Sequence, residues 1–259
     1  MLVRLLGTVS VNIDGGLRDI RASKVRAMLA TLALDPGRPL SYDDLAAELW
    51  SGRSLSNARN AVQAHAARLR KLIDGPGGIA VRAVPNGYLL DVAPEEVDAS
   101  RFLTLASRGA ALARTEPHRA IGLLEEAMLL WRGPALLDAG DGLRCRSAAV
   151  LFEERRLGVW EDITTARLAV GDHVTAAADL GPLVTQYPLR EVFCEQLMLA
   201  LYRCGRQSDA LATFHRTRAR LDEEMGLQPS RRLRQCYADI LAQDPALAED
   251  VTPVGAPSA

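Results

Sequence analysis

The sequence predicts a mainly α-helical fold with a small β component. Strand-like patterns occur only before residue 94, and almost everything after it has the apolar spacing of amphipathic helices. Part of the later region repeats every 34 residues. With 259 residues, of which 48% are hydrophobic and 24% charged, the chain can form two ordinary domains. We expect one domain at 1–93, a second at 94–245 and a disordered tail at 246–259.

The first domain is predicted to be a winged helix-turn-helix. β-branched residues at strand spacing precede an Asp-Gly-Gly turn, and a Pro-Asn-Gly turn joins two later strands. Between these strands lie three helical patterns, each with a serine as candidate N-cap (Ser23, Ser41 and Ser56). The expected order is sheet, helix, helix, loop, helix and hairpin, with the hairpin at 79–92. We expect Gly87 to have the positive φ that its turn favours.

The helix predicted at 56–73 has one face without any acid. Its apolar side consists of Val62, Ala66, Leu69 and Ile73. The opposite side carries Asn57, Asn60, Ala64, Ala67, Arg68 and Lys71. Six basic residues and one acid lie between Arg53 and Arg82, although the whole chain has a net charge of -1. DNA phosphates would exclude acids from such a face, whereas the plainer alternative is a solvated face that lacks acids by chance.

The second domain is predicted to be an all-α, tetratricopeptide-like stack of helix pairs. Gly171 and Gly205 open similar segments 34 residues apart, which aligns Ala176 with Ala210. A looser copy surrounds Ala120. Each helix pair in such a repeat buries its apolar face against a neighbouring pair.

Residue patterns for catalysis or metal binding are missing from the sequence. There is no nucleophile elbow, no HExxH motif and no phosphate-binding loop. The histidines lack metal-ligand spacing, and the four cysteines are expected to be reduced thiols: Cys145, Cys194, Cys204 and Cys236. No signal peptide or membrane span is apparent. We therefore expect a cytoplasmic protein that is not an enzyme and uses no cofactor or metal.

Seven segments in order then resemble one known family over residues 1–243. They are LLGTVSV, AELWSG, SNARNAVQAHAARLRKLI, NGYLLDV, AMLLWRGPALLD, PLREVFCEQLMLALYRCGRQSDAL and EEMGLQPS. Together they resemble the Streptomyces antibiotic regulatory protein family. The resemblance implies an OmpR-type winged helix followed by a bacterial transcriptional activation domain.

The resemblance also implies a function and its partners. Members of the family activate secondary-metabolite (antibiotic) gene clusters by binding direct repeats in double-stranded DNA at promoters and recruiting RNA polymerase holoenzyme. We therefore expect a sequence-specific, nucleoid-associated activator that acts as a homodimer or as side-by-side protomers, without membrane contact. No receiver-like segment precedes the winged helix, so we expect no phosphoaspartate control. The alternative is a tetratricopeptide interaction adaptor whose winged helix binds protein.

The expected DNA-binding residues fall into three groups. Base edges would be read from the helix at 56–73, by Asn57, Asn60, Ala64 and Arg68. Phosphates or the flank of the site would be met by Lys24, Arg59, Gln63, Arg70 and Lys71. The wing would contribute Arg82 and Asn86. The loop before the helix resembles the polymerase-contacting segment of OmpR-type activators, which makes Arg53 and Ser54 candidate polymerase contacts.

Overall fold

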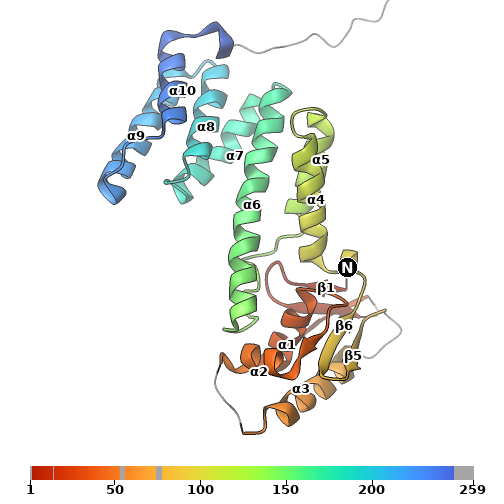
Figure 1. Ribbon diagram of the computed structural model, residues 1–259. Helices are drawn as coiled ribbons and strands as arrows, with labels where there is room; N and C mark the ends of the chain where they lie inside the picture. Colours follow the sequence, from red (N-terminus) through yellow and green to blue (C-terminus); the bar gives the residue numbers. More distant parts are fainter. Residues whose placement is uncertain (1, 14, 53–55, 74–77, 248–259) are drawn as a thin grey trace, which may run out of the picture. The chain divides into compact units, whose positions relative to one another are not determined.

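The computed structural model describes residues 2–13, 15–52, 56–73 and 78–247. Most of these residues are helical and a few form short strands, which confirms the predicted fold class (Figure 1). The chain divides into two compact units, residues 1–108 with 123–159 and residues 109–122 with 160–259. The boundary passes through three helices. The sequence domains predicted at 1–93 and 94–245 stay predictions, and the predicted tail lies outside the described residues from Ala248 onward.

The first unit contains two three-stranded antiparallel sheets. The first sheet has the order β1-β2-β3, formed by Val3–Arg4, Ser10–Ile13 and Gly16–Asp19. The second has the order β4-β6-β5, formed by Leu40–Ser41, Gly87–Asp91 and Ala80–Val84. β5 and β6 form the expected hairpin, with Val84 opposite Gly87. Both predicted β-regions are therefore confirmed.

Three helices complete the winged helix-turn-helix: α1 (Ser23–Ala33), α2 (Tyr42–Trp50) and α3 (Ala58–Ile73). α2 begins as expected, because the Ser41 side chain accepts the Asp44 N–H at 3.0 Å and the Asp44 carboxylate returns to the Ser41 backbone. This capping box satisfies two backbone donors at the helix start.

Three local expectations were wrong. Ser23 does not cap α1, because the helix already includes it and Ala22 occupies the N-cap without a side-chain bond. Ser56 lies in a turn two residues before α3, which begins at Ala58. Gly87 lacks a positive φ. A Cβ there would come within 2.8 Å of the Leu40 carbonyl carbon, so the close approach of β4 requires the glycine.

Buried hydrogen bonds join the N-terminal sheet to later residues of the first unit. After η1 (Pro94–Glu96), α4 (Asp98–Leu112) starts with an aspartate whose side chain is fully buried. Its carboxylate accepts the N–H groups of Leu5 and Leu6 at 2.6 and 3.2 Å, and the Arg132 guanidinium at 2.5 Å. The segment between α5 (Pro117–Met128) and α6 (Leu143–Ala169) also donates the Leu136 N–H to the Leu5 carbonyl at 2.7 Å.

The second unit contains the repeated helices. They are α7 (His173–Gln186), α8 (Glu191–Arg203), α9 (Gln207–Met225) and α10 (Arg231–Ala242), followed by η2 (Pro245–Leu247). Gly171 and Gly205 both have the left-handed φ, at +81° and +75°. α7 and α9 begin 34 residues apart, and Ala176 and Ala210 are fully buried at equivalent positions. The predicted repeat is confirmed.

Candidate nucleic-acid interface

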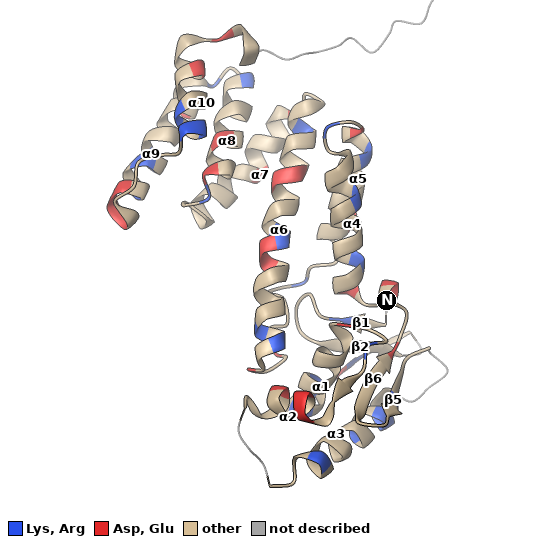
Figure 2. Ribbon diagram, viewed as in Figure 1, with Lys and Arg blue, Asp and Glu red and all other residues tan. Residues whose placement is uncertain are grey.

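Burial divides α3 into two faces, as the sequence predicts. Val62, Ala66, Leu69 and Ile73 are buried against the first unit. The exposed positions from the preceding turn onward include Asn57, Arg59, Asn60, Gln63, Ala64, Ala67, Arg68 and Lys71. α3 contains Lys and Arg but no Asp or Glu (Figure 2). This exposed face carries cations and no acid, so it suits a polyanion.

The centre of the exposed face combines small, amide and cationic side chains. Asn60, Ala64 and Arg68 follow one another at four-residue spacing, so they form a row along the helix. Within the described residues, Arg68 and Lys71 have no carboxylate partner. Asparagine and arginine can each make two hydrogen bonds to a base edge, and alanine lets the helix approach the groove floor.

Two other arginines of α3 lie against aromatic rings. The Arg59 guanidinium lies 4.7 Å from the centre of the Tyr42 ring, and that of Arg70 lies 5.1 Å from the Tyr88 ring. The two tyrosines pack edge to face, with ring centres 5.7 Å apart. Arg70 also donates its Nε–H to the Val81 carbonyl at 2.8 Å. These contacts fix α3 to the start of α2 through Tyr42 and to the second sheet through Tyr88 and Val81.

This environment shifts the pKa values of the two tyrosine hydroxyls in opposite directions. A hydrogen bond from Gln63 is the largest influence that lowers the pKa of Tyr42, and nearby Tyr88 and Arg59 add to it. Burial raises the pKa of Tyr88. The Gln63 side chain therefore lies beside the Tyr42 hydroxyl. The sequence reading did not single out Tyr42 as an interface residue, since its contacts are non-local.

The remaining candidate contacts differ in how accessible they are. Lys24 is half-buried and donates its ammonium to the Leu49 carbonyl near the end of α2. Arg82 is 67% exposed on β5 and pairs with Asp91 across the hairpin. Asn86 is exposed in the hairpin turn. The structure thus places Arg82 and Asn86 on an open wing, whereas Lys24 is engaged between helices.

His65 lies at the edge of the same helix, beside Trp50. The two ring centres are 5.8 Å apart, and the His65 Nδ1 is buried without a partner in the described structure. Burial, with Arg68 and Lys24 as further causes, lowers the pKa of His65. The ring is therefore neutral at neutral pH.

Several other sequence expectations concern parts of the chain away from α3. Arg53 and Ser54 lie outside the described residues. Over the described ranges, His, Cys, Asp and Glu form no group of three or more that could hold a metal ion. The four cysteines are free thiols. Every helix in the described part of the chain is too short or too polar to cross a bilayer.

Two family models match the chain. Residues 21–90 match the C-terminal domain of transcriptional regulatory proteins. Residues 97–241 match the bacterial transcriptional activator domain. The first match spans α1 to the hairpin, and the second spans the start of α4 to the end of α10.

Relatives share both parts. The chain is 52% identical over 251 residues to the transcriptional regulator RedD of Streptomyces coelicolor, covering 95% of this chain and 71% of RedD. It is 33% identical to the regulatory protein DnrI of Streptomyces peucetius, covering 95% and 94%. A solved structure of Mycobacterium tuberculosis EmbR in complex with a low-affinity phosphopeptide matches with a TM-score of 0.88 and 32% identity, over 94% of this chain and 65% of EmbR. The chain belongs to the Streptomyces antibiotic regulatory protein family of transcriptional activators, with an OmpR-type winged helix and a bacterial transcriptional activator domain.

Proposed function

We propose that this protein binds double-stranded DNA sequence-specifically at promoters and activates a secondary-metabolite (antibiotic) gene cluster. α3 enters the major groove, and the β5–β6 hairpin meets the backbone or the adjacent minor groove. Two protomers bind direct repeats side by side and recruit RNA polymerase holoenzyme. The protein acts in the cytoplasm, at the nucleoid.

The acid-free exposed face of α3 is the observation that carries this proposal. The buried apolar residues of α3 anchor the helix to the first unit, and its polar side is open to solvent. We assign Asn57, Asn60, Ala64 and Arg68 to base edges and Lys71 to phosphate. Arg59 and Arg70 also add positive charge, but their ring contacts make them positioning residues first.

The partner assignments depend more on the family than on geometry. RedD and DnrI are named as a transcriptional regulator and a regulatory protein, which supports transcription as the process. The stacked helices of the second unit offer surfaces for protomer or polymerase contact. Arg53 and Ser54 remain proposed polymerase contacts.

Selection of duplexes from a random library by the purified full chain tests the proposal directly. Near-physiological salt suppresses general phosphate binding. A recovered motif, repeated directly about 10 base pairs apart, is the expected result. Recovery of random duplexes alone would favour the adaptor alternative, in which the winged helix binds protein.

A double variant tests which face reads DNA. Asn60→Ala with Arg68→Ala removes two base-edge partners, so specific affinity should fall by about 100-fold or more. The matched control is Arg155→Ala, at an exposed arginine of α6 far along the chain from α3. Circular dichroism should be unchanged for both proteins. Wild-type binding by the double variant would contradict the placement of the face.

A further inference from the structure

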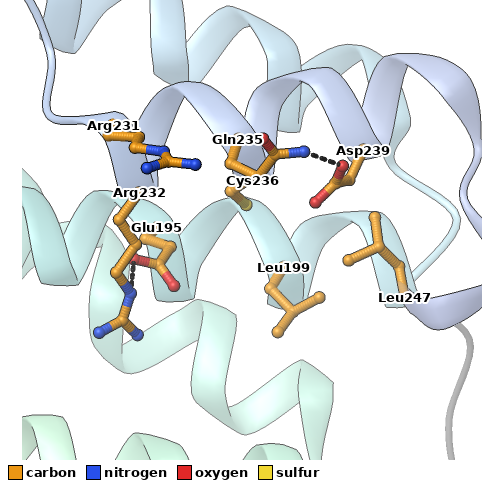
Figure 3. Close-up of a pocket in the computed structure, with 8 residues that line it drawn as sticks. All are labelled: Glu195, Leu199, Arg231, Arg232, Gln235, Cys236, Asp239 and Leu247. Carbon is orange, nitrogen blue, oxygen red and sulfur yellow. Dashed lines mark hydrogen bonds and ion pairs between the residues drawn. The ribbon is translucent and has the colours of Figure 1, made fainter.

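A groove between α8 and α10 of the second unit has the size of a small-molecule site. Its volume is about 690 Å³, within the roughly 300–1,000 Å³ typical of ligand sites. Its lining comes from α8, α10 and η2 (Figure 3): Glu195, Leu199, Arg231, Arg232, Gln235, Cys236, Asp239 and Leu247. None of these residues belongs to the interface on α3.

The groove has Arg231 at one end and an apolar middle, and its length can be measured along α10. Arg231 lies at one end of the row of side chains, Asp239 and Leu247 lie at the other, and Cys236 lies between them (Figure 3). From Arg231 to Asp239 the helix rises about 12 Å, at about 1.5 Å per residue. Burial raises the pKa of the Cys236 thiol to about 12, so this side chain is uncharged and contributes an apolar surface with Leu199.

Most of the charges in the groove are already paired. The Arg232 Nε contacts Glu195 Oε2 at 2.6 Å, and Gln235 donates its Nε2–H to Asp239 Oδ1 at 2.7 Å. Arg231 is exposed and pairs with no carboxylate among the described residues. The Arg231 guanidinium therefore has its donors available at one end of the groove, beside the neutralised Arg232–Glu195 pair, and the Asp239 carboxylate keeps its charge at the other end.

We propose that this groove binds a small amphipathic acid about 12 Å long. Its anionic group pairs with Arg231, because a guanidinium binds carboxylates through charge-assisted hydrogen bonds. Its apolar body covers Leu199, Cys236 and Leu247. Asp239 at the far end repels a second anion, so the ligand class is a mono-acid rather than a diacid. Medium-chain carboxylic acids have this length and charge pattern.

A bound acid would connect α8 with α10 and therefore stabilise the second unit. A ligand that binds only the folded state raises its stability in proportion to the logarithm of ligand concentration above the Kd. This stabilisation needs no DNA, so a test of acid binding is independent of a test of the proposed function.

The test uses decanoate with the full-length protein, followed by calorimetric titration and thermal unfolding. We expect saturable binding of one decanoate per chain and a rise in Tm. Decyltrimethylammonium, which has the same chain length but the opposite charge, should give neither. Arg231→Gln should weaken decanoate binding by about tenfold or more. Arg234→Gln, at an exposed arginine of the same helix outside the groove, is the matched control and should bind as the wild type does.

Three results would overturn the proposal. They are no saturable decanoate binding up to about 10 mM, equal binding by Arg231→Gln and wild type, and equal binding of the cationic chain. Leu199→Trp gives an independent check, because a larger side chain fills the groove and should abolish binding. If that variant does not fold, the surface pair Arg231→Gln and Arg234→Gln still decides the question.

Discussion

Arg70 shows how one side chain on α3, the helix proposed to bind DNA, can serve the fold. Its Nε–H is 2.8 Å from the Val81 carbonyl, and its guanidinium lies over the Tyr88 ring. Both contacts use the planar shape of the guanidinium, which a lysine lacks. Charge alone would therefore not replace Arg70, although charge alone is sufficient for a phosphate contact.

Arg70→Lys is expected to lower the free energy of unfolding by about 1 kcal/mol, because a hydrogen bond and a ring contact are lost. The dependence of DNA affinity on salt should stay at the wild-type slope, since the charge is kept. Lys71→Ala is the control, with unchanged stability and a salt slope reduced by about one. Denaturant unfolding and titrations at several salt concentrations measure both quantities. Unchanged stability of Arg70→Lys would show that its contacts with Val81 and Tyr88 contribute little.

The sequence correctly predicts that position 87 needs a glycine, but the reason it suggests, a positive φ, is wrong. A Pro-Asn-Gly turn favours positive φ at glycine, but here the glycine is required because β4 passes too close for a Cβ. Gly87→Ala should cost about 3 kcal/mol, since the overlap is with backbone atoms that cannot move aside easily. Gly122→Ala, in α5 with open space around the added Cβ, should instead stabilise by up to about 1 kcal/mol. Thermal unfolding of both variants checks this, and a mild effect at Gly87 would mean that β4 can shift.

At the scale of elements, a titratable histidine of α3 packs against the last residue of α2. His65 packs on Trp50, and burial lowers its pKa below the usual value of 6.5. Between the lowered pKa and about 6.5, the unfolded chain binds more protons at this histidine than the folded chain does. The free energy of unfolding therefore falls as pH falls through this window.

His65→Gln removes that proton linkage. We expect the wild type to lose more stability than the variant between pH 7.5 and pH 5.5, as measured by denaturant unfolding at each pH. His118→Gln, at an exposed histidine of α5, serves as the control and should follow the wild type. Identical pH profiles for the wild type and His65→Gln would refute the burial argument.

The elements themselves were largely predictable because their signals are local. Apolar spacing gave the buried face of α3, and the 34-residue offset gave the equivalence of Ala176 and Ala210. Contacts between distant residues leave no such signal. The hydrogen bond from Arg70 to Val81 and those from the Leu5 and Leu6 N–H groups to the buried Asp98 depend on tertiary packing that spacing cannot reveal.

At the scale of the whole molecule, the proposed function constrains the spacing between the two DNA repeats. Direct repeats place both protomers in the same orientation, so any contact between them is head to tail and joins two different surfaces. Such a contact forms only when both protomers face the same side of the duplex. Repeats about 10 base pairs apart meet this condition, because this distance is one helical turn.

Insertion of about 5 base pairs between the repeats rotates the second site by half a turn. The second protomer then lies on the opposite face of the duplex, and cooperative binding should be lost. Affinity for the altered duplex should equal that for a single repeat, which is the control measured on the same gels. Cooperative binding that survives the half-turn insertion would mean that the protomers do not meet through a fixed contact. The coupling between the two sites would then have to pass through the DNA or through a flexible contact between the protomers.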